Sequence, residues 1–213
     1  MIEANAVLLA GGKSTRFGDD KALIYFQNRP LIEYIYSKLN NFFKKVIIIA
    51  NDGEYDFLEG AFIKKDIIEN KGPLGGIYSG LYYSDKKYNF VVGCDMPFIK
   101  EEYFSYLMAK IEKEKSDVLA AEKNGYIEPL AAVYSREVLP LIKEKINEDK
   151  LRLKSFYDQC RVEVIKEAEL TKKFDLEKLF FNINYPEDKI KAEKLLRENM
   201  IKADKWRGES EKI

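Results

Sequence analysis

The sequence predicts an α/β fold: a Rossmann-like, three-layer α/β/α sandwich built on a mostly parallel β-sheet. Short apolar runs alternate with helical patterns through the first two thirds of the chain, an order that produces parallel strands with helices on both faces. The length of 213 residues suits one large domain. Because no repeat or linker-like stretch divides the chain, we expect one domain over residues 1–205 and a polar tail over 206–213.

The expected strands are continuous apolar runs, which is typical of strands buried on both faces of a parallel sheet. A turn at 123–125 separates the fourth run from the fifth. A further short strand is expected near the end of the domain. The runs are residues 6–10, 46–50, 90–93, 118–121 and 130–134, and the late strand is 180–183.

Proline marks the start of several expected helices, because its fixed φ suits the first helical turn. Pro30 precedes a segment whose apolar residues Leu31, Ile35 and Leu39 share one helical face. The closing helix begins near Pro186 and carries acids in its first turn, where they suit the helix dipole. Other helices are expected after residue 73, from about 100 to 113, at 136–147 and at 152–159.

The composition excludes several classes of function. Lys plus Arg and Asp plus Glu both total 36, so no net field favours nucleic acid or an anionic membrane. The absence of histidine removes His-based triads and His-ligated zinc, which leaves carboxylates, lysine, tyrosine and metal ions for chemistry. Cys94 and Cys160 have no metal-type spacing. Neither a signal peptide nor an apolar run of ~20 residues is present, so we expect a soluble cytoplasmic protein.

A glycine-rich turn after the first strand is the most informative segment. Gly11 and Gly12 stand at the carboxyl end of that strand, where open α/β sheets bind ligands. Backbone N–H groups of such a turn form a nest for anions, and Arg16 and Lys21 add two cations close by. A guanidinium fork and an ammonium around a nest of amides suit a nucleoside triphosphate.

Two better-known phosphate loops do not fit this turn. A Walker A motif requires glycine at position 7, which is Val7, and the G-x-G-x-x-G fingerprint fails because Gly11 and Gly12 are adjacent. The alternative is a plain strand-to-helix turn with a solvated basic face. The complete string at the end of the first strand favours the phosphate-binding interpretation.

Asp95 follows the third apolar run and is a candidate ligand for Mg²⁺. A hard cation prefers carboxylate oxygens and commonly takes one or two carboxylates together with substrate phosphates. The alternative is an aspartate that caps the helix beginning near Ile99. The neighbouring Cys94 fits a small buried core residue better than a nucleophile, because no base stands beside it.

The string from Leu9 to Lys21 resembles L-A-G-G-x-S-x-R-x-G-x-D-K, the signature of the nucleotidyltransferase superfamily that includes molybdenum cofactor guanylyltransferases. The segment from Cys94 to Ile99 resembles its C-D-x-P-[FY]-[IL], in which the aspartate binds magnesium. The resemblance implies the nucleotide-diphospho-sugar transferase type of fold. It also implies a GTP site that includes Leu9, Ala10, Gly11, Gly12, Lys21 and Asp95, with Arg16, Lys21 and Asp95 as catalytic residues.

Softer matches extend the resemblance to other parts of the site. Gly75 lies in a G-P-L-x-G segment near the nucleotide base and ribose, and Asn51 and Asp66 match nucleotide-contacting positions. Asn182 and Asn184 lie in N-x-N-x-P-E-D, which the resemblance places against a pterin substrate. An ordinary loop, strand-end caps and a plain helix start are the alternatives. Glu128-Pro129-Leu130 stands where the family usually has a short polar residue before proline and a strand.

The implied activity is transfer of GMP from GTP to Mo-molybdopterin with release of pyrophosphate, with Mg²⁺ as cofactor. Two other activities remain alternatives, because enzymes of both kinds share the first loop. They are a cytidylyltransferase acting on the same pterin and a sugar-1-phosphate nucleotidyltransferase. A nucleotide-binding regulatory module is the non-enzymatic alternative, although it would not need the metal carboxylate. Expected partners are GTP, the molybdopterin-type acceptor and, transiently, cofactor-biosynthesis proteins or molybdoenzymes, but neither nucleic acid nor a membrane.

Overall fold

The computed structural model describes residues 3–10, 20–51 and 55–210, with side chains through residue 198. Its main sheet has seven strands in the order β5-β4-β1-β6-β8-β7-β9. Neighbouring strands are parallel except at β8, which runs antiparallel to β6 and β7. The mostly parallel sheet is therefore confirmed. The strands are β1 (Asn5–Leu9), β4 (Val46–Ile49), β5 (Phe62–Lys64), β6 (Tyr88–Gly93), β7 (Val118–Lys123), β8 (Tyr126–Ser135) and β9 (Val162–Ile165).

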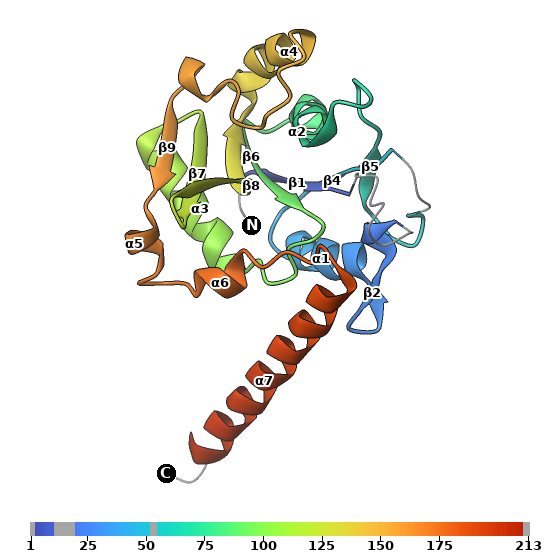
Figure 1. Ribbon diagram of the computed structural model, residues 1–213, viewed down its shortest axis with the longest axis vertical. Helices are drawn as coiled ribbons and strands as arrows, with labels where there is room; N and C mark the ends of the chain where they lie inside the picture. The colour runs from blue at the N-terminus through green and yellow to red at the C-terminus, as the bar shows by residue number, and fades with distance from the viewer. Residues whose placement is uncertain (1–2, 11–19, 52–54, 211–213) are drawn as a thin grey trace.

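Helices cover both faces of the sheet, as Figure 1 shows. Helices α1 and α3 pack on one face and α2 and α4 on the other, which gives two separate apolar clusters. A two-stranded hairpin, β2 (Tyr25–Phe26) and β3 (Arg29–Pro30), leads into α1. The helices are α1 (Leu31–Asn40), α2 (Gly72–Tyr83), α3 (Glu101–Glu114), α4 (Leu139–Asn147), α5 (Glu167–Leu170), α6 (Leu176–Leu179) and α7 (Pro186–Ser210), and the 3-10 turns are Lys21–Leu23, Arg136–Val138 and Tyr157–Gln159.

Helix α2 lies unusually close to the central strand β1. A Cβ on Gly80 would stand 2.2 Å from Val7 Cγ1, so a side chain at this position would clash with the sheet. Val7 and the α2 residues Leu74 and Ile77 are fully buried in the same cluster. Burial of side chains of this size contributes roughly 1.5–3 kcal/mol each. Nearer the start of the helix, a Cβ on Gly76 would stand 3.1 Å from Leu9 Cδ2, so the beginning of α2 lies beside the carboxyl end of β1.

Two of the expected elements were wrong. Residues 180–183 form no strand; Phe180 and Ile183 are apolar because they pack into the α1/α3 cluster as a loop. Instead of a helix at 152–159, the structure has turns and the single 3-10 turn Tyr157–Gln159. The sequence analysis did not identify β5 and β9, whose segments of three and four residues obtain their pairing from neighbouring strands.

Helix α7 extends away from the body of the molecule (Figure 1). It begins at Pro186, as expected, and runs through Ser210. Residues 206–210, which belong to the expected polar tail, are helical. Asp188 Oδ2 accepts hydrogen bonds from the N–H groups of Asn184 and Tyr185, both at 3.0 Å, which fixes the entry into the helix.

Candidate active site

The parallel strands β4, β1 and β6 end at one edge of the sheet. Hydrogen bonding continues just beyond the strands: Ala10 N–H donates to the Ile49 carbonyl (2.9 Å) and Cys94 N–H to the Leu9 carbonyl (3.0 Å). Leu9 and Ala10 are both buried. These contacts fix the backbone where the glycine-rich turn and the Asp95 segment begin. This is the edge at which open α/β sheets bind ligands.

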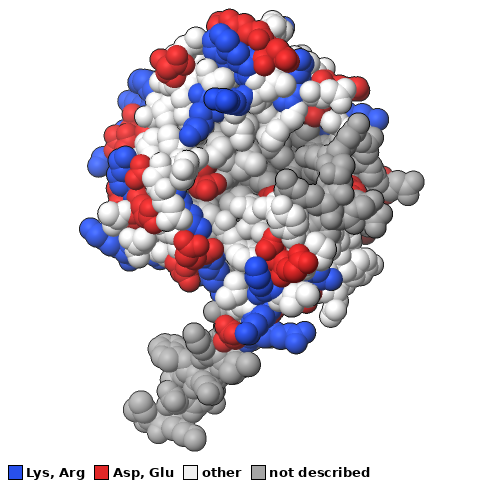
Figure 2. Space-filling view, viewed as in Figure 1, with Lys and Arg blue, Asp and Glu red and all other residues white. Residues whose placement is uncertain are grey.

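The view in Figure 2 looks onto this face of the molecule. Most charged side chains lie around its rim, while acidic atoms also appear within its largely uncharged middle. Gly11, Gly12 and Arg16 lie outside the described residues, so their expected phosphate contacts stay predictions. Lys21 is described, and it opens the 3-10 turn Lys21–Leu23.

Lys21 joins three distant parts of the chain. Its ammonium donates to Asp95 Oδ2 and to Asn184 Oδ1, at 2.8 Å in both cases. The Lys21 and Asp95 side chains are 16% and 23% exposed, so the ion pair lies in a partly sheltered place that a ligand can still reach. Ile183 N–H also donates to the Asp95 carbonyl (2.9 Å), which ties the segment before α7 to the end of β6.

The second oxygen of Asp95 has no partner among the described residues. Asp95 Oδ1 is buried and forms no hydrogen bond in the described structure. A Cβ at position 93 would stand 2.6 Å from this oxygen, so Gly93 is required for the present carboxylate position. A buried carboxylate oxygen without a donor is costly, and a cation or a donor from a ligand would satisfy it.

Asp95 does not cap the following helix. Helix α3 starts at Glu101, its N-cap residue is Lys100, and no side chain forms a capping hydrogen bond there. The unpartnered Asp95 oxygen fits a hard cation such as Mg²⁺. Among the described residues no three acids, cysteines or histidines gather as a metal cage, so such a cation would take its other ligands from substrate oxygens and water.

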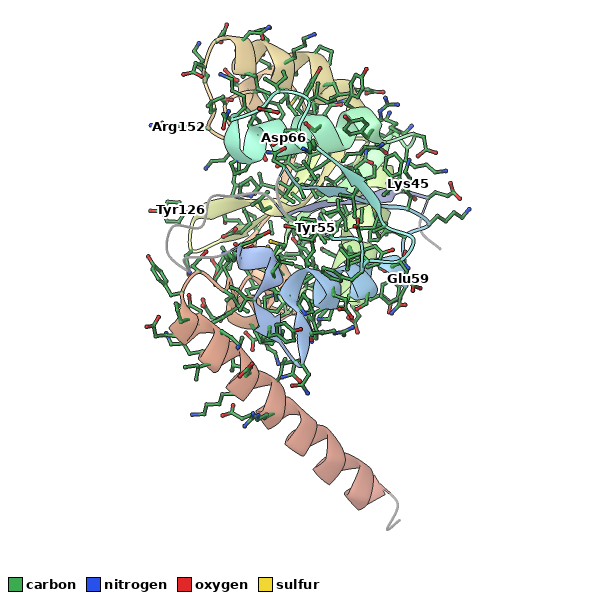
Figure 3. The ribbon with its side chains drawn as sticks, turned by 90° about the vertical axis from the view of Figure 1, so that its right-hand side faces the viewer. Lys45, Tyr55, Glu59, Asp66, Tyr126 and Arg152 are labelled. Carbon is green, nitrogen blue, oxygen red and sulfur yellow. The ribbon has the colours of Figure 1, made fainter. Side chains whose placement is uncertain are left out.

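A second polar cluster lies at the ends of β4 and β5. Asn51 and Asp66 form a reciprocal pair: Asn51 Nδ2 donates to Asp66 Oδ2, and Asp66 N–H donates to Asn51 Oδ1, both at 2.8 Å. The buried Ser79 hydroxyl accepts from Ile67 N–H (2.9 Å) and stands 3.1 Å from Asp66 Oδ1 and 2.8 Å from the Gly75 carbonyl. Figure 3 shows Asp66 beside α2.

This cluster brings together three residues that the sequence analysis named. Asn51, Asp66 and Gly75 come from different elements and meet through Ser79, which the sequence analysis did not identify. A Cβ at position 75 would stand 3.2 Å from the Ile68 carbonyl, so the backbone approaches closely here. Whether these residues contact a nucleotide stays a prediction.

The two asparagines before α7 have different surroundings. Asn184 points its side-chain oxygen at Lys21 and so belongs to the Asp95 cluster. Asn182 instead donates from Nδ2 to the carbonyl of Phe180 (3.1 Å), which is a local loop contact. The structure thus joins one of the pair to the candidate site, and the pterin contact expected for both stays a prediction.

Lys38 of α1 supports the segment after Asp95. Its ammonium donates to the carbonyls of Pro97 (2.7 Å) and Ile99 (3.4 Å) and stands 4.6 Å from the centre of the Tyr34 ring. Burial, together with nearby cations, lowers its pKa to about 8. The sequence analysis did not identify this residue, since an isolated lysine on an amphipathic helix normally faces solvent.

Cys94 is a buried core residue, as expected. Burial, helped by the charge of Asp95, raises the pKa of its thiol above the usual range. The thiolate that a nucleophile requires is therefore disfavoured.

A lysine is paired with an aspartate at the carboxyl edge of this α/β sheet, and the family match identifies the chain as a nucleotidyltransferase. The chain belongs to the family described as the MobA-like NTP transferase domain, which matches residues 6–164. It is 34% identical over 206 residues to a probable molybdenum cofactor guanylyltransferase of Pelotomaculum thermopropionicum, covering 97% of this chain and 99% of the relative. It is 32% identical to the molybdenum cofactor guanylyltransferase of Desulfosudis oleivorans, covering 94% and 100%.

Solved structures agree on the fold. Molybdopterin-guanine dinucleotide biosynthesis protein A from Archaeoglobus fulgidus superposes with a TM-score of 0.81 at 25% identity, covering 91% of this chain and 99% of the other. A CMP:2-keto-3-deoxy-manno-octonic acid synthetase has a TM-score of 0.66 at 11% identity, covering 92% and 98%, a likeness in fold alone. The nucleotide-diphospho-sugar transferase type of fold is thus confirmed. None of the described helices is long and apolar enough to cross a bilayer.

Proposed function

We propose that the protein transfers GMP from GTP to Mo-molybdopterin, which yields the guanine dinucleotide cofactor and pyrophosphate. Relatives named molybdenum cofactor guanylyltransferase that match almost the full length of the chain support this activity. Among the structural observations, the meeting of Lys21, Asp95 and Asn184 carries it, because a cation, a carboxylate and an amide converge where a triphosphate would lie. For this activity we expect the protein to lie in the cytoplasm and to make transient contact with cofactor-biosynthesis proteins or molybdoenzymes.

In this reaction the terminal phosphate oxygen of molybdopterin attacks the α-phosphorus of GTP. The bond from the α-phosphorus to the bridging oxygen breaks, and its electron pair leaves with pyrophosphate. No general base is needed, because a phosphate monoester is already an anionic nucleophile at neutral pH. Positioning and neutralisation of charge therefore provide most of the catalysis.

Each site residue has a part in this scheme. Lys21, with the amides of Gly11 and Gly12 and the guanidinium of Arg16, holds the phosphates and neutralises the departing pyrophosphate. Asp95 would hold a magnesium ion, which would supply Lewis-acid stabilisation of the phosphate oxygens. On the other side of β1, Asn51, Asp66 and Gly75 form the surface for base and ribose.

A thermal-shift panel of GTP, CTP, ATP and UTP with Mg²⁺ tests the proposal. A ligand present at 100 times its Kd stabilises the folded state by about 2.7 kcal/mol, which raises Tm by roughly 5–10 °C for a chain of this size. We expect this rise with GTP and clearly smaller rises with the others. A larger rise with CTP would assign the protein to the cytidylyl branch, and equal rises would leave no support for a guanine-selective site.

A further inference from the structure

Glu128 is a charged residue near the candidate site, and no role has been assigned to it above. It lies near the beginning of β8, which runs antiparallel to β6 and therefore starts at the edge where β6 ends. A Cβ at Gly93 would lie 3.8 Å from Leu130 Cδ1, so the first half of β8 passes beside the segment that carries Asp95. Glu128 is thus brought next to Asp95 from a part of the chain more than thirty residues away.

The carboxylate of Glu128 is half-buried and forms no hydrogen bond or ion pair with the residues described in 3–10, 20–51 and 55–210. Burial raises its pKa, Lys123 opposes this effect, and the negative charge of Asp95 adds to it. Lys123 forms its own ion pair with Glu177 Oε2 at 3.0 Å, so it leaves Glu128 without a direct partner. A half-buried acid in this condition is costly unless a ligand supplies the missing donors.

The order of the strands decides which ligand part reaches Glu128. The Asn51–Asp66 pair lies at the ends of β4 and β5, Asp95 lies at the end of β6, and Glu128 lies on β8, on the opposite side of Asp95. From β4 to β8 there are three strand spacings, which is roughly 14 Å. If the nucleotide base lies at β4 and the reacting phosphates lie near Asp95, the acceptor extends over β8.

The charge of Glu128 limits the part of the acceptor that it can contact. A carboxylate beside Asp95 repels phosphate groups. It accepts hydrogen bonds well from a planar pair of N–H donors, because its two oxygens match two parallel donors. The pyrimidinone ring of a pterin carries such a pair, a ring N–H and an exocyclic amino group.

We propose that Glu128 binds the acceptor by accepting two hydrogen bonds from the ring N–H and amino group of the pterin, and so selects an aminopyrimidinone ring. This assignment rests on the proposed function, since it needs a pterin acceptor. In this arrangement Asp95 acts at the phosphates and Glu128 binds the pterin ring.

The test compares Glu128→Gln with Glu122→Gln in steady-state transfer from GTP to molybdopterin. Glu122 lies on the same hairpin, but its carboxylate pairs with Lys166 at 2.9 Å, which makes it a matched control. We expect Glu128→Gln to raise KM for molybdopterin about 10- to 100-fold, as for loss of a bidentate contact, with an unchanged KM for GTP. The control should match the wild type. An unchanged KM for molybdopterin in Glu128→Gln would overturn the proposal.

A second measurement separates ring recognition from a structural role. 6-Hydroxymethylpterin and 6-hydroxymethyllumazine, which has an oxo group in place of the amino group, are compared as inhibitors. The wild type should prefer the pterin, and Glu128→Gln should lose or reverse this preference, because glutamine offers one donor and one acceptor. Equal preference in wild type and variant would overturn the proposal.

Two further outcomes are distinguishable. If Glu128→Gln raises the Mg²⁺ concentration for half-maximal GTP thermal shift, Glu128 binds the cation instead, which overturns the ring contact. If the wild type shows no transfer from GTP to molybdopterin, the proposed function fails before any variant is considered. Normal GTP binding by Glu128→Gln shows that the variant is folded, and Glu128→Asp, with a shorter arm, should show a smaller rise in KM.

Discussion

The two polar clusters at the carboxyl edge of the sheet differ in how completely the protein satisfies them. At the ends of β4 and β5, Asp66 has a partner for each oxygen and for its N–H. At the end of β6, neither Asp95 Oδ1 nor the Glu128 carboxylate forms a hydrogen bond or ion pair within the described part of the chain. In the Asn51–Asp66 cluster the polar groups of Asp66 are satisfied within the protein, and we expect a nucleotide base to pack against this surface. In the Asp95–Glu128 cluster, carboxylate oxygens lack partners among the described residues, and a cation and substrates would satisfy them.

The incomplete cluster is therefore where substitution should affect chemistry most. Asp95→Asn keeps the size of the side chain but removes the charge that makes it a ligand for a hard cation. We expect transfer to fall on the order of 10³-fold, since a metal ion stabilises charge at the phosphates by several kcal/mol. Pyrophosphate release measures the loss. A Tm close to the wild-type value shows that the fold is kept, and full activity in the variant would contradict the metal role.

Lys21→Ala probes the same cluster from its cationic side. The variant loses a contact that strengthens as charge moves onto pyrophosphate, so kcat should fall on the order of 10²-fold, more than KM for GTP rises. The exposed Lys44, which pairs with Glu3, supplies the control Lys44→Ala with unchanged kinetics. Near-normal turnover in Lys21→Ala would mean that the Lys21 ammonium is only a solvated surface group with no part in catalysis.

Ser79→Ala tests the Asn51–Asp66 cluster, in which the polar groups are satisfied within the protein. It removes the hydroxyl that contacts Ile67 N–H and Asp66 Oδ1, and an unsatisfied buried donor costs about 1–3 kcal/mol. We expect the free energy of unfolding to fall by this amount. KM for GTP should rise about tenfold, which corresponds to the loss of one hydrogen bond, and kcat should be nearly unchanged. Ser84→Ala removes another buried serine, far from the nucleotide surface, and should change stability alone. A fall in kcat for Ser79→Ala comparable to that of Lys21→Ala would contradict the proposal that one cluster affects GTP binding and the other affects catalysis.

The smallest expected effect concerns Lys38, which supports the segment after Asp95. Its pKa lies near 8 in the folded protein, below the ordinary value of 10.5, because burial and the nearby Lys100, Arg29 and Lys178 disfavour its charge. Between these pH values the unfolded state binds more protons, so stability should rise as pH increases from about 8 to 10.5. The rise should be about 1–2 kcal/mol, since partial exposure weakens the effect.

Lys38→Met should lack this rise. Urea unfolding of both proteins between pH 7 and 10 measures the difference. Buried tyrosines such as Tyr103 and Tyr134 have raised pKa values and affect both proteins alike at higher pH, so the comparison isolates Lys38. If the stabilities of the two proteins changed with pH in parallel, the pKa of Lys38 would not be lowered in the folded state, which would contradict the prediction.

The sequence alone determined the fold class, the central strands and the family. Continuous apolar runs such as Val46–Ile49 indicate buried strands. Glycines followed by Arg16 and Lys21 predict a phosphate-binding turn through local chemistry. Lys21 and Asp95 were named as candidate site residues in this way, and in the structure Lys21 Nζ lies 2.8 Å from Asp95 Oδ2. Signals of this kind lie within about a dozen residues, so they can be read along the chain.

The tertiary structure decided what depends on contacts between distant segments. Strand β9 exists because β7 pairs with it, and Phe180 is apolar because it packs under α3 rather than because it forms a strand. Ser79 and Lys38 carry no distinctive local pattern, and the Glu128-Pro129-Leu130 segment gave no role for Glu128. The roles that we propose for them depend on burial and on neighbours that the sheet order supplies, because the energy of a polar group is set by the partners around it in space.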